Sequence, residues 1–382
     1  MLVTAKGLQG LKYFKVLGPL LERLHEHGTQ RDRAGNRRLH FDQYACLLLL
    51  FFYNPIITSL RGIQQASLLA RVQKLLGCKR AALGSLSEAS RVFDAEALQP
   101  IIAELAAQAL PMSQGKEVEA LRGLTAVDGS FLLALPRMAW ALFQDENNRA
   151  VKMHVHFDVL KGVPCGVSVT TAIDPEQDQL RAKLQPGRLY VIDRGYAVYQ
   201  LFQDILDGQS SFVGRVRNDA AFKMLHERPL TAAAHAAGVL RDCQVQLGAA
   251  SQRKVLRMPV RLVWVGTGKL QADGTPEILV LATNRFDLDA ELVALAYKYR
   301  WSVELFFRWL KCTLGCRHLL ANSQNGVTMQ VYLAIIASLL ISLWVGKKPT
   351  KRTFEMLQFY FTGWATEAEL LAHLDKLYDQ PD

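Results

Sequence analysis

The stretch YKYRWSVELFFRWLK, residues 297 to 311, most limits how this chain can fold, because it sets charged side chains into a largely apolar segment. Read as a helix at about 100° per residue, it places four polar side chains on one stripe about 60° wide. These are Tyr297, Arg300, Glu304 and Lys311. Apolar side chains cover the flanks and the back. The pattern predicts one mostly buried helix with a narrow polar seam.

The carboxylate of Glu304 in this seam has two interpretations. In the first, Glu304 forms a structural network with Arg300 and Lys311 that holds a core helix, which is the commoner arrangement in an arbitrary sequence. In the second, Glu304 is an active-site carboxylate flanked by side chains that bind phosphate. The rest of the sequence has to decide between them.

Composition and charge indicate a polyanionic partner. The chain has 382 residues, 50% of them hydrophobic, which is enough for two or three domains with a sizeable core. Its net charge is +10, and basic clusters at 31–38, 71–80 and 347–352 together favour nucleic acid. The six cysteines include no C-x-x-C pair, which is typical of reduced thiols in a cytoplasmic protein.

No segment has the pattern of a targeting or membrane-spanning sequence. The N-terminal residues MLVTAKGLQGLKYFKVL lack the order of regions found in a signal peptide. The apolar runs 45–53 and 331–344 fall short of the roughly 20 residues that a transmembrane helix requires. We therefore expect both runs to be buried core helices and the protein to have no membrane partner.

The N-terminal region, residues 1–118, shows helical apolar spacing from about Leu8 to Leu110. Residues 58–93 look like short helices joined by a glycine-containing turn. This arrangement is compatible with a helix-turn-helix, and a plain helical bundle fits nearly as well. We expect an N-terminal all-helical DNA-binding region.

Residues 119–218 change to strand-like patterns. Strands are expected at 124–132, 152–160 and 163–172, followed by the apolar run LYVI, a helix and a further strand. The order resembles a ribonuclease-H-like core, and the pattern alone supports an α/β fold class.

The remaining chain divides into three parts. Residues 219–284 form a β-rich insertion, because the strand-like segments VQLGA, KVLRMPVRLVWVG and EILVLATN are separated by turn residues. The core resumes with helices at 285–346. Residues 347–382 are expected to form a C-terminal helical tail.

Two aspartates follow apolar strands of the expected core. Asp128 comes after TAV, and Asp193 comes after LYVI. In open α/β sheets, reactive groups gather at the carboxyl ends of neighbouring strands. A single aspartate there is more often a cap or turn residue. Two of them, with Glu304 in a polar seam, make coincidence less plausible.

Three carboxylates in one crevice repel each other unless cations neutralise them. Oxygen ligands of this kind suit Mg²⁺ or Mn²⁺. Two such ions can activate a water or a 3′ hydroxyl at a phosphodiester and stabilise the leaving oxygen.

The four seam residues have the spacing Y-x2-R-x3-E-x6-K, which is similar to the Y-R-E-K signature of DDE transposases of the insertion-sequence-four family. VDGS around Asp128, VIDRGY around Asp193 and the β-rich insertion extend the resemblance, which spans roughly residues 85 to 345.

The resemblance implies the roles of the candidate residues. On a ribonuclease-H-like fold, two divalent ions would be held by Asp128, Asp193 and Glu304, and DNA strands would be cut and joined at the ends of the mobile element. The terminal phosphates of the transposon end would be contacted by Tyr297, Arg300 and Lys311.

The resemblance also implies partners and a location. The partners would be double-stranded DNA, both terminal inverted repeats and target, and a second copy of the chain in a homodimer. The site of action would be the nucleoid of the bacterial cytoplasm. Some family members cleave through a DNA hairpin with a flipped base. Trp264 and Trp301 are candidates to stabilise such a base, and ordinary core tryptophans are the favoured interpretation.

Other features have simpler interpretations. His154 and His156 form an H-x-H pattern that suits a metal, but on an alternating strand it usually marks a polar face. Asp158, beside them, is expected to end a hairpin strand. Two rival functions stay open: a nuclease that cleaves without joining, and a DNA-binding protein whose acidic residues are idle.

Overall fold

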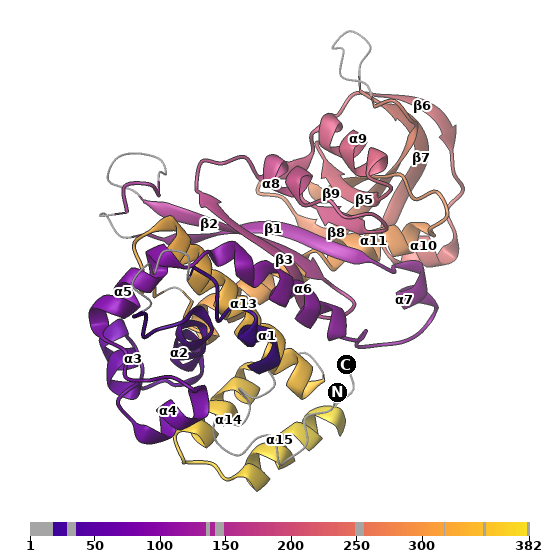
Figure 1. Cartoon of the computed structure of the whole chain (residues 1–382). Helices are drawn as coiled ribbons and strands as arrows, with labels where there is room; N and C mark the ends of the chain where they lie inside the picture. The colour runs from indigo at the N-terminus through magenta and orange to yellow at the C-terminus, as the bar shows by residue number, and fades with distance from the viewer. Residues whose placement is uncertain are drawn as a thin grey trace.

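The computed structural model describes residues 18–28, 36–134, 138–141, 149–248, 256–316, 318–346 and 349–379. Figure 1 shows the helices of the N-terminal and C-terminal regions packed together beside one long, continuous sheet. The nine strands of this sheet have the order β3-β2-β1-β4-β5-β9-β8-β7-β6. The predicted α/β class is therefore confirmed.

Five strands make the half of the sheet that carries both aspartates. They are β1 (Leu124–Leu133), β2 (Ala150–Asp158), β3 (Val163–Thr171), β4 (Leu189–Ile192) and β5 (Ser211–Val216). The first three are antiparallel neighbours, while β4 is parallel to β1 and β5 is parallel to β4. The connections contain α8 (Glu176–Ala182), the 3-10 helix η5 (Arg194–Tyr196) and α9 (Tyr199–Asp207). The order of strands and helix α9 along the chain agrees with the sequence prediction.

Strand β2 is buried at every position, because it lies between β1 and β3 and other parts of the chain cover both of its faces. Phe157 packs against Phe306 on one face, and Lys152 contacts Glu176 on the other. The expectation of a polar face at His154 and His156 is therefore wrong. Burial lowers the pKa of His154 to about 4 and that of His156 to about 3, so both rings are neutral at physiological pH. His154 Nε2 lies 2.8 Å from Thr170 Oγ1. Asp158 ends the strand as expected, since its Oδ1 accepts from the backbone N–H of Lys161.

The insertion continues the same sheet instead of forming a separate one. Its elements are β6 (Phe222–Glu227), α10 (Ala232–Ala236), β7 (Val239–Leu247), β8 (Val260–Leu270) and β9 (Pro276–Thr283). The junction is the antiparallel pairing of β9 with β5, in register from Val213 opposite Thr283 to Val216 opposite Val280. The β-rich character of the insertion thus agrees with the sequence.

A buried ion pair ties the insertion to the helices that follow it. Asp242 and Arg261 are 2% and 1% exposed, and two guanidinium nitrogens of Arg261 donate to the two carboxylate oxygens at 2.8 and 2.5 Å. Arg261 Nη1 also donates to the carbonyl of Leu288. Leu288 lies two residues before the start of α11 (Ala290–Lys298), so the pair helps to fix where that helix begins.

The helices at the two ends of the chain include one long apolar helix, α13. They are α1 (Gly18–Glu22), α2 (Phe41–Tyr53), α3 (Leu60–Ala66), α4 (Ala70–Leu76), α5 (Leu83–Val92), the 3-10 helix η4 (Ala95–Leu98), α6 (Gln99–Gln108), α7 (Lys116–Ala120), α13 (Gln324–Val345), α14 (Lys351–Phe361) and α15 (Glu367–Asp379). Helices α2, α5, η4 and α6 pack directly against α13. The helical character predicted for both ends of the chain agrees with these elements. Arg31, Arg33, Lys347 and Lys348 lie outside the described residues.

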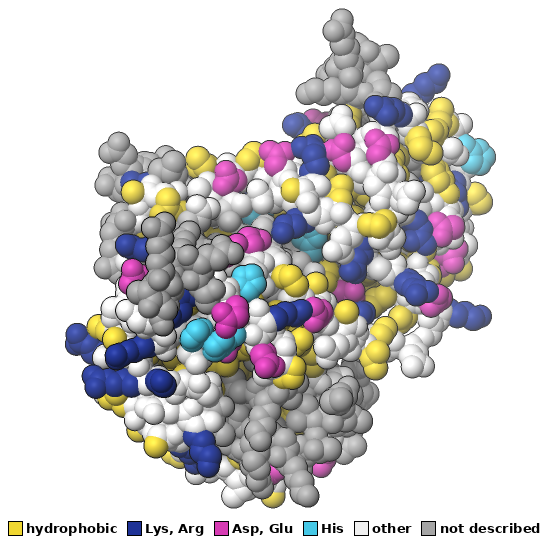
Figure 2. Space-filling view, viewed as in Figure 1, with side chains coloured by type: hydrophobic (Ala, Val, Ile, Leu, Met, Phe, Trp, Pro, Cys, Tyr) yellow, Lys and Arg dark blue, Asp and Glu magenta, His cyan; other side chains and the backbone are white. Residues whose placement is uncertain are grey.

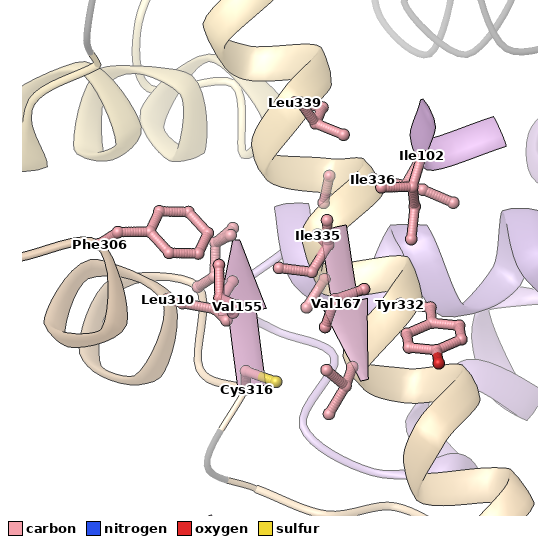
Figure 3. Close-up of a cluster of buried hydrophobic side chains, with 14 of the residues drawn as sticks. Ile102, Val155, Val167, Phe306, Leu310, Cys316, Tyr332, Ile335, Ile336 and Leu339 are labelled. Carbon is pink, nitrogen blue, oxygen red and sulfur yellow. The ribbon is translucent and has the colours of Figure 1, made fainter. Parts of the chain in front are cut away.

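Helix α13 is longer than the sequence suggested. It has 22 residues with a mean hydropathy of 2.0, so the argument that its apolar run is too short for a membrane is wrong. Its most apolar window is 89% buried, because the helix packs against α2, α6 and β3. Figure 3 shows Ile335 of α13 in one apolar cluster with Val155 of β2 and Phe306. The run is a core helix, as expected.

Replacing Asp242 with Ala is expected to lower the free energy of unfolding by about 3 to 5 kcal/mol, because the Arg261 guanidinium would stay buried without its carboxylate. The matched control is Asp219→Ala, which removes an exposed pair with Arg217 and should leave that free energy nearly unchanged. Urea unfolding of both variants measures the difference. Equal effects would contradict the anchoring role of Asp242.

Candidate active site

Asp128 and Asp193 lie where two parallel strands separate. Strands β1 and β4 pair in register only as far as Ala126 opposite Val191. Strand β1 is buried from Leu124 through Val127 and becomes partly exposed at Asp128. Strand β4 ends just before Asp193, and the chain turns away into η5. The two carboxylates therefore border one opening at the carboxyl ends of the strands.

The seam helix is interrupted twice, so the prediction of one continuous helix from 297 to 311 is wrong. Helix α11 ends at Lys298, α12 (Trp301–Arg308) begins three residues later, and a π-helix η7 (Trp309–Thr313) follows. At the first break, the backbone N–H of Arg300 donates to the carbonyl of Tyr297, a three-residue spacing that tightens the turn. A π-turn adds a residue to the helix, and such turns are frequent at functional sites.

Despite the breaks, the four seam side chains reach the two strand ends. The Tyr297 hydroxyl donates to Asp193 Oδ1 at 3.0 Å. Lys311 Nζ donates to the hydroxyl of Ser130, two residues beyond Asp128, at 2.8 Å. The structure thus brings together all six residues that the sequence singled out.

Arg300 stands between two of the three carboxylates. Its Nη2 lies 2.7 Å from Glu304 Oε1, and its Nη1 lies 3.4 Å from Asp128 Oδ2. The Arg300 side chain is only 12% exposed, so this positive charge is largely removed from water. In the protein alone, the guanidinium therefore provides positive charge that partly neutralises Asp128 and Glu304.

The two aspartates titrate differently. Burial raises the pKa of Asp128 to about 6, and the negative charges of Glu176 and Glu304 raise it further. The backbone N–H of Gly129 and the positive charge of Arg300 lower the pKa, but they do not outweigh burial. Burial also acts on Asp193, but its pKa is lowered, because backbone N–H donation from Arg194, the charge of Arg300 and the hydroxyl of Tyr297 outweigh it. Asp128 is the carboxyl that resists ionisation.

Sequence reasoning missed a fourth carboxylate at this opening. Glu176, the first residue of α8, lies 2.6 Å from Lys152 Nζ, which belongs to β2. The pair lies against Gly129: a Cβ atom there would be 2.6 Å from Glu176 Oε1 and 2.8 Å from Lys152 Cε. Glycine at 129 is thus needed for this close approach, which is a better account of the Asp-Gly sequence than a turn.

The donor set suits a hard divalent cation, because it consists of carboxylate and hydroxyl oxygens. Among the described residues, no three His, Cys, Asp or Glu side chains already converge closely enough to hold an ion. Asp128 and Glu304 do not converge because the Arg300 guanidinium occupies the space between them. The hydroxyl of Tyr196 is buried with no hydrogen-bond partner in the described structure, which leaves a polar atom for a bound group. The residues fit Mg²⁺ or Mn²⁺.

The two candidate tryptophans differ in exposure. Trp301 is 56% exposed at the start of α12, so its interpretation as a core residue is wrong. Trp264 is partly buried in β8, where its ring lies 5.2 Å from the guanidinium carbon of Arg241.

The sequence pattern of the family described as the transposase DDE domain matches residues 119–340, more than half of the chain. The chain belongs to the transposase DDE domain family. The resemblance to DDE transposases is therefore confirmed. The matched region contains Asp128, Asp193 and all four seam residues.

Two relatives of this family carry the word transposase in their names. One, from Sinorhizobium fredii, is 30% identical over 213 residues, which are 55% of this chain and 57% of the relative. The other, from Geobacillus stearothermophilus and named for an insertion sequence element, is 29% identical over 228 residues, which are 58% of this chain and 56% of the relative. The chain thus spans little more than half the length of the curated relatives it matches.

Among solved structures, a chain of the piggyBac transposase synaptic complex with hairpin DNA is similar at a TM-score of 0.43 and 12% identity, over 98% of this chain and 86% of that chain. A likeness this weak supports no conclusion about the site.

Asp128→Asn is expected to stabilise the metal-free protein increasingly as pH rises from 3.8 to about 6. The pKa of Asp128 is higher in the folded protein than in the unfolded chain, so its contribution to stability is present below that interval and is lost across it. Asparagine does not titrate, so the variant keeps its stability across this interval. Its free energy of unfolding should exceed that of wild type by roughly 1 to 3 kcal/mol at the upper end. Urea unfolding in EDTA at several pH values measures this difference, and a pH-independent difference would contradict it.

Proposed function

We propose that this chain is a transposase that cleaves and joins DNA strands at the ends of an insertion sequence, in the manner of the insertion-sequence-four family. The observation that carries the proposal is the arrangement of the three carboxylates in a chain of the transposase DDE domain family: Arg300 joins Asp128 to Glu304, and the Tyr297 hydroxyl donates to Asp193. In this proposal the three carboxylates hold two divalent ions, Mg²⁺ or Mn²⁺.

The interpretation of the polar seam as a purely structural network is less favourable on this geometry. A structural network would pair each charge within the core, whereas Asp128, Arg300 and Glu304 all keep some exposure at the strand-end opening. Bound ions would activate a water or a 3′ hydroxyl and stabilise the leaving oxygen of the phosphodiester. The chain's own contribution is to fix the carboxylates at the ends of β1 and β4 and on α12.

Three seam residues are proposed to contact DNA phosphates. When bound metal ions neutralise the carboxylates in place of Arg300, the Arg300 guanidinium is available to donate two hydrogen bonds to one phosphate. Tyr297 stays protonated, because burial and Asp193 raise the pKa of its hydroxyl, so it remains a hydrogen-bond donor. Lys311 supplies a positive charge next to the strand that carries Asp128, where its Nζ donates to the hydroxyl of Ser130.

The proposed partner is double-stranded DNA, both terminal inverted repeats and target, bound by a homodimer. A basic surface over α3 to α5 supports a role of the N-terminal region in binding it (Figure 2). The exposed cations of that surface include Arg71, Lys74, Lys79 and Arg80. We place the reaction at the nucleoid of a bacterial cytoplasm, with no membrane involved.

Glu304→Gln tests the proposal, because it removes a metal-binding charge at nearly constant volume. Cleavage of supercoiled DNA that carries the element's own inverted repeats is compared in Mg²⁺ and in EDTA. We expect Mg²⁺-dependent breaks at the repeat ends, and a rate at least about a hundredfold lower in the variant, with DNA binding retained. Glu119→Gln, at an exposed glutamate, is the matched control and should cleave normally.

The same assay separates the rival functions. Cleavage that ignores the inverted repeats would favour a nuclease, and binding to the ends without cleavage by folded wild type would favour a non-catalytic protein. If Glu304→Gln unfolds the chain but its folded fraction stays fully active, the seam is a structural network.

A further inference from the structure

Glu176 is held at the strand-end opening by contacts with residues other than the six candidate residues. Its neighbour Gln177 donates from Nε2 to the carbonyl of Gly195 at 2.7 Å, which fastens the start of α8 to the turn after Asp193. Cβ atoms built at positions 129 and 195 would lie 2.6 and 3.6 Å from the two oxygens of the Glu176 carboxylate. The carboxylate therefore fills the space between the residues that follow Asp128 and the turn that follows Asp193.

The charge of Glu176 is only partly compensated. Its one ion-pair partner in the described structure is Lys152, whose side chain is 10% exposed, while that of Glu176 is 23% exposed. A purely internal pair needs no exposure, whereas a carboxylate that meets a hydrated ion does. The carboxylate lies against the residue that follows Asp128, since a Cβ atom at Gly129 would be 2.6 Å from Glu176 Oε1.

Tyr196 gives an independent sign of a missing partner. The residue is 1% exposed, and its hydroxyl makes no hydrogen bond within the described structure. Tyr196 ends η5, the turn that directly follows Asp193. Burial raises the pKa of its hydroxyl, and the charges of Glu176, Asp128 and Asp193 act in the same direction. A buried hydroxyl without a partner is energetically unfavourable, and a water on a bound cation would give it a hydrogen-bond acceptor.

We infer that Glu176 is a fourth metal-binding carboxylate of the candidate site, acting with Asp128 and Asp193 on one divalent ion. Tyr196 donates its hydroxyl hydrogen bond to a group bound with that ion. Lys152 is a positioning residue that holds the carboxylate against Gly129. This inference rests on the proposed function, because it requires the three predicted carboxylates to bind metal.

Binding of Mn²⁺ to the full chain without DNA, measured by isothermal titration calorimetry, tests the inference independently of activity. Glu176→Gln is expected to weaken binding about tenfold or more. The matched control is Asp178→Asn on the same helix, which removes a carboxylate paired with Arg181 and should bind Mn²⁺ like wild type. Wild-type affinity in Glu176→Gln would overturn the inference.

Two further variants protect the test against simple misfolding. Glu176→Gln leaves Lys152 buried without its partner, so the double variant Lys152→Met with Glu176→Gln removes both charges together and should show the same loss of Mn²⁺ affinity.

Tyr196→Phe removes the unpartnered hydroxyl. It should fold as well as wild type without metal and gain less thermal stability from Mn²⁺. An unchanged gain would contradict the role given to Tyr196.

Asp128→Asn distinguishes failure of this inference from failure of the proposed function. If Asp128→Asn weakens Mn²⁺ binding and neither variant of Glu176 does, the site binds metal without a fourth carboxylate. If Asp128→Asn also binds like wild type, the metal site itself is misplaced.

Discussion

Like charges gathered in a poorly solvated opening must be neutralised, and this constraint connects most features of the site. Asp128, Asp193, Glu304 and Glu176 lie around the point where β1 and β4 separate. Arg300 neutralises two of them, Lys152 neutralises Glu176, and the Tyr297 hydroxyl donates to Asp193. Glutamates 176 and 304 still raise the pKa of Asp128. The protein alone is thus left with negative charge that divalent cations can neutralise more completely.

The fold brings these groups together from distant parts of the chain. Parallel pairing places the ends of β1 and β4 side by side, and α12 packs on β1 and β2 so that its seam faces them. The insertion intervenes between β5 and α11, yet it extends the same sheet and fixes the start of α11 through the buried Asp242–Arg261 pair. A long β-rich segment therefore separates the second aspartate from Glu304 in sequence without separating them in space.

Local patterns were sufficient to predict the parts of the site that depend on few neighbours. Apolar runs followed by Asp128 and Asp193 predicted strand ends, and helical spacing predicted that one seam would reach them. The break at Arg300 and the π-turn before Lys311 depend on packing against the core, which periodicity does not contain. The burial of His154 depends on the segments that cover that face of the sheet, which the H-x-H pattern does not contain. Glu176 was missed because its partners lie on other strands, and a glutamate at a helix start is ordinary.

The central claim is that divalent ions take over from Arg300 as the countercharge of the carboxylates. Crystals of the protein grown with Mn²⁺, measured at the manganese absorption edge, test this most directly. The account predicts anomalous peaks bound by Asp128, Asp193 and Glu304, with the Arg300 guanidinium withdrawn from Asp128. Saturating Mn²⁺ with no peak at these carboxylates, and with Arg300 still between Asp128 and Glu304, would contradict it.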